Sequence, residues 1–199
     1  MVAAGLVVDG EPVDSETEEN YWMPNDTSTG HEGANDSGSY LADIRRLGDI
    51  EEIKQLKARY FRYVDLHWWP ELRGLFADDA VFEIGESTSC PRTSEEFVAS
   101  VGRHLSEAVS VHHGHMPEIR IVDAETAHGI WAMFDLVEPS AGSGYPALTG
   151  YGHYTESYRK IDGRWRITRL RLTRLKRSVD GAVVEGDGVD GRREFVEPW

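Results

Sequence analysis

The sequence contains a single cysteine, Cys90, and no long hydrophobic run among its 199 residues. One cysteine excludes an intrachain disulfide and a metal cluster built on several thiolates, and this scarcity is typical of the reducing cytoplasm. A membrane-spanning helix needs about 18 apolar residues in a row, and no segment approaches that length. The first residues also lack the basic start of a signal peptide. The sequence therefore predicts a cytoplasmic protein that does not insert into a membrane.

Basic residues are absent from the first part of the chain. Residues 1–44 contain no Lys or Arg, and nine acids fall between Asp9 and Asp36, which accounts for most of the net charge of −14. Phosphate backbones are repelled by such a charge, so we expect no nucleic-acid partner. This segment lacks hydrophobic periodicity and is rich in small polar residues. It is predicted to be a flexible acidic arm over residues 1–44.

Helical periodicity begins near Asp49. Apolar residues recur at a spacing of three or four, which predicts a first helix ending near Asp65, with Lys57 among the charged residues on its solvent side. Pro70 favours a second, short helix in WPELRGLFA (69–77). A strand is predicted at AVFEI (80–84), and Ser94-Glu95-Glu96 is typical of the start of a third helix.

The hydrophobic period falls to two after Glu107, which predicts four long strands, over residues 109–123, 127–138, 149–161 and 164–175. Three helices followed by these strands indicate an α+β domain over residues 45–178. We expect a cone-shaped, curved antiparallel sheet covered by the three N-terminal helices, with a pocket between the first helix and the sheet. Residues 179–199 form a tail, in which AVVE (182–185) is a candidate for one further strand.

Asp65 is the first candidate functional residue, because the stretch YFRYVDLHWW (60–69) places it among five aromatic residues. It either turns to solvent at the helix end or faces inward. Tyr60 lies on the apolar side of the helix, and a buried phenol needs a hydrogen-bond partner. Both side chains can face one cavity if the helix ends near Asp65. An inward carboxylate is suited to acid–base chemistry or to orienting an imidazole.

The motif VHHGH (111–115) supplies candidate imidazoles. On a strand, His112 faces opposite to His113 and His115. The latter two could share a metal ion, but the sequence fixes no third ligand, so no metal site is predicted. We expect at least one imidazole to line the pocket, and either His112 or His113 fits, because a β-bulge would exchange the two faces.

A family resemblance joins these segments. Tyr60, Asp65, Trp69 and LFADDAVFE (75–83) resemble the opening of the SnoaL-like branch of the nuclear transport factor 2-like superfamily. VHHGHMPEIRI, ETAHGIWAMFDLV and GHYTESYRKIDGRWRITRL continue the resemblance, which spans residues 45–177. It implies a cystatin-like fold and pairing of two copies through the open face of the sheet, so a homodimer is expected.

The pattern is most similar to the dehydratases of this superfamily, scytalone dehydratase and bile acid 7α-dehydratase. That resemblance implies that Asp65 orients His112, which acts as acid and base, and that Tyr60 and Arg174 complete the catalytic set. Val64 replaces a tyrosine of scytalone dehydratase, so a scytalone-like substrate is disfavoured. The remaining pocket residues are expected to be aromatic, apolar or imidazole side chains, namely Val64, Trp69, His113, Trp131, Met133 and Tyr154.

These residues predict a lyase or isomerase of the dehydratase type that needs no cofactor. Its substrate would be a hydrophobic small molecule such as a steroid or polyketide. One imidazole is sufficient for the reaction, because it can remove a C–H proton and then protonate a departing hydroxyl. The fold hosts many functions, and two alternatives remain open. One is a non-catalytic binding or structural subunit, like the β subunits of aromatic-ring dioxygenases. The other is a SnoaL-type polyketide cyclase.

Overall fold

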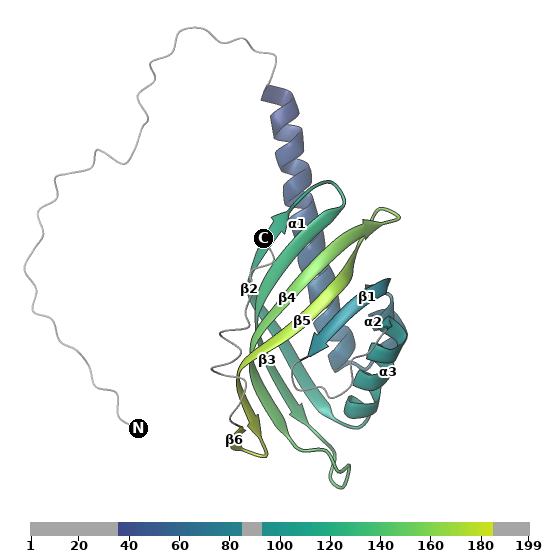
Figure 1. Ribbon diagram of the computed structural model, residues 1–199, viewed down its shortest axis with the longest axis vertical. Helices are drawn as coiled ribbons and strands as arrows, with labels where there is room; N and C mark the ends of the chain where they lie inside the picture. Colours follow the sequence, from purple (N-terminus) through teal and green to yellow (C-terminus); the bar gives the residue numbers. More distant parts are fainter. Residues whose placement is uncertain (1–35, 85–92, 185–199) are drawn as a thin grey trace, which may run out of the picture. The chain divides into compact units, whose positions relative to one another are not determined.

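A computed structural model describes residues 36–84 and 93–184. The predicted acidic arm up to residue 35, Cys90 and the tail beyond residue 184 lie outside the described residues. The elements follow in the order α1 (Asp36–Asp65), α2 (Trp69–Arg73), β1 (Phe76–Ile84), α3 (Ser94–Leu105), β2 (Val109–Ile121), β3 (Thr126–Glu138), β4 (Leu148–Ile161), β5 (Arg164–Val179) and β6 (Ala182–Val184) (Figure 1).

The first helix differs from its prediction at two points. It begins at Asp36, inside the segment predicted as the arm. Periodicity did not reveal this extension, because its large apolar residues, such as Tyr40 and Ile44, are exposed and mark no buried side. Lys57 was predicted to face solvent, which is wrong: it is completely buried, because the curved sheet covers that side of the helix and supplies an acidic partner.

The sheet has the strand order β1-β5-β4-β3-β2, with β6 pairing on β5. Its long strands β2 to β5 pair antiparallel, as predicted. However, β1 runs parallel to β5, so the sheet is mixed rather than wholly antiparallel. A short apolar strand carries no signal for its direction in a sheet. The predicted further strand is present as β6.

All three helices pack on the same, concave side of the curved sheet (Figure 1). Helix α3 begins at the N-cap residue Thr93, whose hydroxyl accepts a hydrogen bond from the Glu96 N–H at 3.1 Å. Phe97 of α3 stacks on Phe82 of β1 with ring centroids 4.0 Å apart, and Phe76 packs edge-on against both rings. The expected α+β architecture, with three helices covering one face of a curved sheet, is confirmed.

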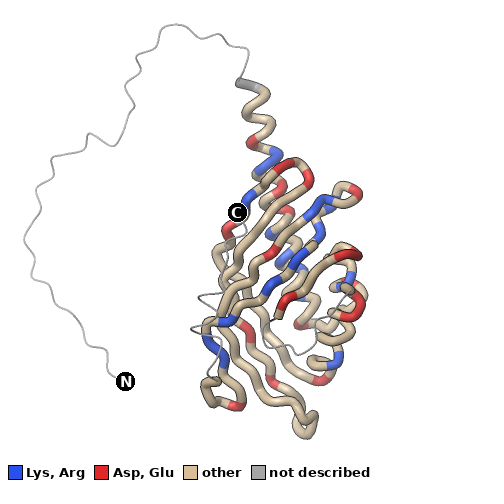
Figure 2. The backbone as a smooth tube through the Cα atoms, viewed as in Figure 1, with Lys and Arg blue, Asp and Glu red and all other residues tan. Residues whose placement is uncertain are grey.

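Basic residues concentrate along β5 (Figure 2). Part of this charge is balanced by the neighbouring strand, because Arg169 donates to both Glu83 oxygens at 2.7 and 3.0 Å and Arg171 lies 3.8 Å from the same carboxylate. In the part of the chain that the structure describes, no helix combines the length and hydrophobicity needed to cross a membrane.

Candidate active site

Helix α1 ends immediately after Asp65, and the way it ends aims this side chain. The Trp68 N–H donates to the Tyr63 carbonyl at 2.9 Å and the His67 N–H to the Val64 carbonyl at 3.2 Å, which is the Schellman pattern of a helix C-terminus. His67 takes the left-handed conformation this motif requires, with φ = 58°. Because the helix stops there, Asp65 can turn toward β2 while Tyr60, five residues earlier, points into the core.

The Asp65 carboxylate is held by three donors from β2. Oδ1 accepts from the Ser110 hydroxyl at 2.9 Å and from His112 Nδ1 at 2.7 Å, and Oδ2 accepts from the His112 backbone N–H at 3.0 Å. The side chains of Asp65 and His112 are 23% and 10% exposed. The predicted inward orientation of Asp65 therefore corresponds to a partly buried dyad with His112.

This geometry fixes the tautomer of the neutral imidazole. A carboxylate only accepts hydrogen bonds, so the Nδ1 of His112 must carry the proton that it donates to Asp65. The lone pair then lies on Nε2. Since His112 lines a cavity, Nε2 is the atom that could accept a proton from a bound molecule, and the adjacent Asp65 carboxylate would stabilise an imidazolium formed there.

A cavity of about 270 Å³ lies between α1, α3 and the concave face of the sheet. Its walls are mainly apolar, and polar side chains interrupt them at a few points. The lining includes Tyr60, Val64, Ile84, Phe97, Val101, His104, Leu105, His112, Asp135, Val137, Leu148, Tyr154, Leu170, Leu172 and Arg174. Such a space, apolar with a few converging polar groups, is typical of a small-molecule site.

Two tyrosines bring hydroxyl groups to the cavity. Tyr60 and Tyr154 are buried, and their rings meet edge-on with centroids 6.0 Å apart. Burial raises the pKa of both phenols well above the ordinary value, with the nearby charge of Glu156 adding to this effect for Tyr60. Both groups therefore stay protonated at neutral pH and can donate hydrogen bonds.

An ion pair lies in the cavity wall on the sheet side. Arg174 donates from Nη1 and Nη2 to the two oxygens of Asp135 at 2.8 and 2.7 Å, and both side chains are buried. Arg174 is thus present in the cavity, as the sequence predicted, but its guanidinium is already bidentate with a carboxylate.

A second buried pair lies behind the tyrosines. Lys57 donates to Glu156 at 2.5 Å, and neither side chain is exposed. The Lys57 ammonium also lies 4.0 and 3.6 Å from the ring centroids of Tyr60 and Tyr154, so it contacts both aromatic faces. Burial lowers the pKa of Lys57, although Glu156 acts in the opposite direction. The Lys57–Glu156 pair therefore packs against the rings of both tyrosines.

The other predicted pocket residues are divided among several places. Val64 and Tyr154 line the cavity together with His112, whereas the adjacent His113 does not. His113 and Trp131 border a second hollow beside α1 and β2, whose lining also includes His112. Trp131 donates from Nε1 to the Tyr158 hydroxyl at 2.9 Å. Met133 is buried in the core.

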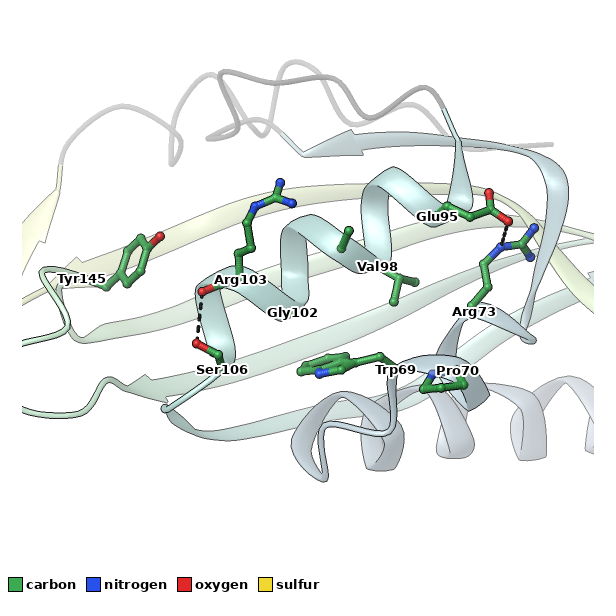
Figure 3. Close-up of a pocket in the computed structure, with 10 residues that line it drawn as sticks. Trp69, Pro70, Arg73, Glu95, Val98, Gly102, Arg103, Ser106 and Tyr145 are labelled. Atoms are coloured by element: carbon green, nitrogen blue, oxygen red, sulfur yellow. Dashed lines mark hydrogen bonds and ion pairs between the residues drawn. The ribbon is translucent and has the colours of Figure 1, made fainter.

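Trp69 lines another hollow, a groove of about 760 Å³ between α2 and α3. Figure 3 shows its ring beneath α3 next to Gly102, with the hydrogen-bonded Arg73 and Glu95 at one end and Tyr145 at the other. The Trp69 ring also stacks on the His67 ring, with the ring centroids 5.1 Å apart. Trp69 therefore lies outside the cavity that His112 lines.

Four polar residues of this region were not among the sequence candidates, namely Ser110, Asp135, Glu156 and Lys57 in its buried role. A signal existed for two of them. Asp135 shares strand parity with Trp131 and Met133, and Glu156 shares it with Tyr154 and Tyr158. An acid at an inward position of a strand must find a partner, because an unpaired buried charge is costly. The partners themselves come from distant strands and helices.

Metal ligands are not grouped in the described part of the chain. Within residues 36–84 and 93–184, no cluster of three or more His, Cys, Asp or Glu side chains is arranged to hold a metal ion.

A profile of the SnoaL-like domain family matches residues 45–171, which is more than half of the chain. The chain therefore belongs to this family. Among curated proteins, a probable cyclase of Gibberella zeae is 25% identical over 133 residues, covering 62% of this chain and 89% of that protein.

Solved structures share the fold. A nuclear transport factor 2-like protein with a cystatin-like fold from Novosphingobium aromaticivorans is 18% identical (TM-score 0.61, 82% of this chain and 100% of that chain). A proposed scytalone dehydratase from the same organism is 19% identical (TM-score 0.60, 68% and 90%). The hexachlorocyclohexane dehydrochlorinase LinA-type3 from Novosphingobium barchaimii is 21% identical (TM-score 0.59, 78% and 99%). At these identities the likeness establishes the architecture alone.

Proposed function

We propose that this protein is a cofactor-independent lyase or isomerase of the dehydratase type, acting on a hydrophobic small molecule such as a steroid or polyketide. The observation that carries the proposal is that His112, whose imidazole is hydrogen-bonded to Asp65, lines a largely apolar cavity. A subunit with a purely structural role has no need of an imidazole held in one tautomer beside such a space. A curated relative named as a probable cyclase, and fold neighbours named for eliminations, support the same class.

The proposed reaction removes water from a hydroxylated carbonyl compound. Nε2 of His112 takes the proton from the carbon beside the carbonyl, and the electron pair of that C–H bond becomes enolate density. The density then forms the carbon–carbon double bond as the hydroxyl on the next carbon departs. The imidazolium returns its proton to that hydroxyl, so water leaves and His112 is regenerated. In an isomerase, the proton would return to a different carbon instead.

Tyr60 is proposed to stabilise the developing enolate. Its hydroxyl is protonated at neutral pH and lies in the same cavity as His112. A donor aimed at the carbonyl oxygen contributes about 3 to 4 kcal/mol to transition-state stabilisation when its geometry is good. The Tyr154 ring packs edge-on against Tyr60 and helps to hold the Tyr60 ring in position.

The test is turnover of a panel of hydrophobic β-hydroxyketones, with 4-hydroxy-4-phenylbutan-2-one as the first probe, because loss of water gives a conjugated enone that absorbs strongly in the ultraviolet. Asp65→Asn and His112→Gln should each lower kcat/KM by about 10²- to 10⁴-fold. His113→Gln is the matched control, since it changes the adjacent imidazole on the opposite face of β2 and should keep the wild-type rate. Equal rates for the His112 and His113 variants would refute the role of the dyad.

A polyketide cyclase is the second candidate, and the named cyclase relative favours it. The same dyad would remove a proton from carbon, but the resulting enolate would attack a ketone within the same molecule and form a carbon–carbon bond. The ketone oxygen would become an alkoxide, and the His112 imidazolium would return its proton to that oxygen. Mass spectrometry separates the two outcomes, because an elimination product lacks one water and the initial aldol product keeps the mass of the substrate.

A further inference from the structure

The Asp135–Arg174 pair is built into three adjacent strands. Asp135 lies on β3 opposite Gly150 of β4, and Arg174 lies on β5 opposite Gly152 of β4. The arginine side chain must therefore cross β4 to reach its partner. A Cβ atom at Gly150 would overlap both Arg174 Nη1 and Asp135 Oδ1. Because Gly150 has no side chain, the Asp135–Arg174 pair can occupy this space.

The pair adjoins the catalytic dyad. His112 on β2 and Asp135 on β3 are direct partners in the antiparallel ladder, and side chains at such positions share a face with Cβ atoms about 5 Å apart. Both line the same cavity, together with Arg174. A molecule close enough to give a proton to His112 would thus lie against this ion pair.

Arginine is the side chain that proteins commonly use to bind a substrate carboxylate, through two parallel hydrogen bonds. In this cavity, Asp135 already occupies that position with both of its oxygens. A carboxylate ligand would have to displace Asp135 and leave its charge buried and unpaired, which is strongly unfavourable. It would also approach the carboxylate of Asp65. An uncharged ligand meets neither obstacle.

We infer that Asp135 is a specificity-determining residue: by closing the Arg174 guanidinium in an internal ion pair, it makes the cavity select uncharged apolar molecules and reject carboxylates. This inference rests on the proposed function, because it defines the class of substrate that the same cavity would admit. It also changes the role expected for Arg174. The arginine forms part of a neutral wall rather than an anion-binding group.

The test compares binding of matched probes that differ in charge. The pairs are benzyl alcohol with benzoate, cyclohexylmethanol with cyclohexanecarboxylate, and 2-naphthylmethanol with 2-naphthoate, titrated at pH 7 by protein-detected NMR. Wild-type protein should bind at least one alcohol about tenfold or more tightly than its carboxylate partner. Asp135→Asn removes the internal carboxylate and should reverse or abolish that preference by tightening the carboxylate.

A neutral double variant guards against misfolding of the single one. Asp135→Asn/Arg174→Gln carries no charge at these two positions and should keep the preference for alcohols. Carboxylates that bind wild type as well as alcohols do, a preference unchanged in folded Asp135→Asn, or failure of every alcohol to bind wild type would overturn the inference. Because the readout is binding, it is separate from turnover: loss of charge selectivity leaves the dyad intact, and a selective but inactive protein refutes only the proposed reaction.

Discussion

Replacement of Lys57 by methionine should lower the free energy of unfolding by about 3 to 5 kcal/mol, which is the usual cost of removing one partner of a buried ion pair. Lys57 and Glu156 are both completely buried. Methionine fills a similar volume but leaves the Glu156 carboxylate with the Tyr158 hydroxyl, at 2.5 Å, as its remaining donor among the described contacts. It also removes the cation that lies against the faces of Tyr60 and Tyr154.

The double variant Lys57→Met/Glu156→Gln separates the loss of a contact from the presence of an unpaired charge. It removes both charges and keeps an oxygen that accepts from Tyr158. Neutral replacement of a buried pair is often close to neutral in stability, so we expect the double variant to lie within about 2 kcal/mol of wild type. Burial already lowers the pKa of Lys57 despite its partner, which indicates that keeping the ammonium in the interior has a cost.

Urea denaturation followed by tryptophan fluorescence measures both differences, since the chain has six tryptophans. A domain of this size shifts its Tm by about 2 to 4 °C for each kcal/mol, so the single variant should melt about 6 to 20 °C below wild type. The reasoning fails if the single variant is as stable as wild type, or if the double variant is no more stable than the single one.

Three further predictions concern Gly150 beside the Asp135–Arg174 pair, the carboxylate of the dyad and the buried phenols. Gly150→Ala should separate Asp135 from Arg174 and lower the free energy of unfolding by about 3 kcal/mol or more. Gly48→Ala, in open space on α1, should instead raise the free energy of unfolding by up to about 1 kcal/mol. Chemical denaturation measures both changes. Ser110→Ala removes one of three donors to the dyad carboxylate and should reduce kcat about threefold to tenfold, as steady-state kinetics would show, with no change refuting the contribution of that hydrogen bond. Burial raises the pKa of three tyrosines in the folded state, namely Tyr60, Tyr154 and Tyr158. Their contribution to stability is therefore complete below pH 10 and is lost as pH rises further, at up to about 4 kcal/mol per pH unit. Ultraviolet titration, compared with the unfolding transition, should show that these phenols ionise only on unfolding.

Local patterns predicted much of the fold. The period of two after Glu107 located four strands, and their observed limits differ by only a few residues. Helix α1 was predicted to end at Asp65, where the structure ends it with a Schellman motif. The direction of β1 could not be obtained in this way. Strand direction depends on which neighbour a strand reaches after the intervening helix, and composition does not record that choice.

The candidate site shows the same division. Tyr60 and Asp65 were identifiable from the sequence because they lie five residues apart on one helix, among aromatic residues. The choice between His112 and His113 remained open, because a bulge anywhere earlier in β2 would exchange the two faces. The structure places the register shift of β2 after His115, so His112 keeps the inward face.

The amino-acid sequence by itself determined the family, the order of the elements and the helix-end carboxylate, because these depend on residues close together along the chain. Only the tertiary structure decided which charges neutralise one another. Lys57 meets Glu156 across 99 positions and Asp135 meets Arg174 across 39. Such pairings form because a buried charge must find its opposite within about 4 Å once the sheet has curved around the helix. That curvature is a property of all the strands together.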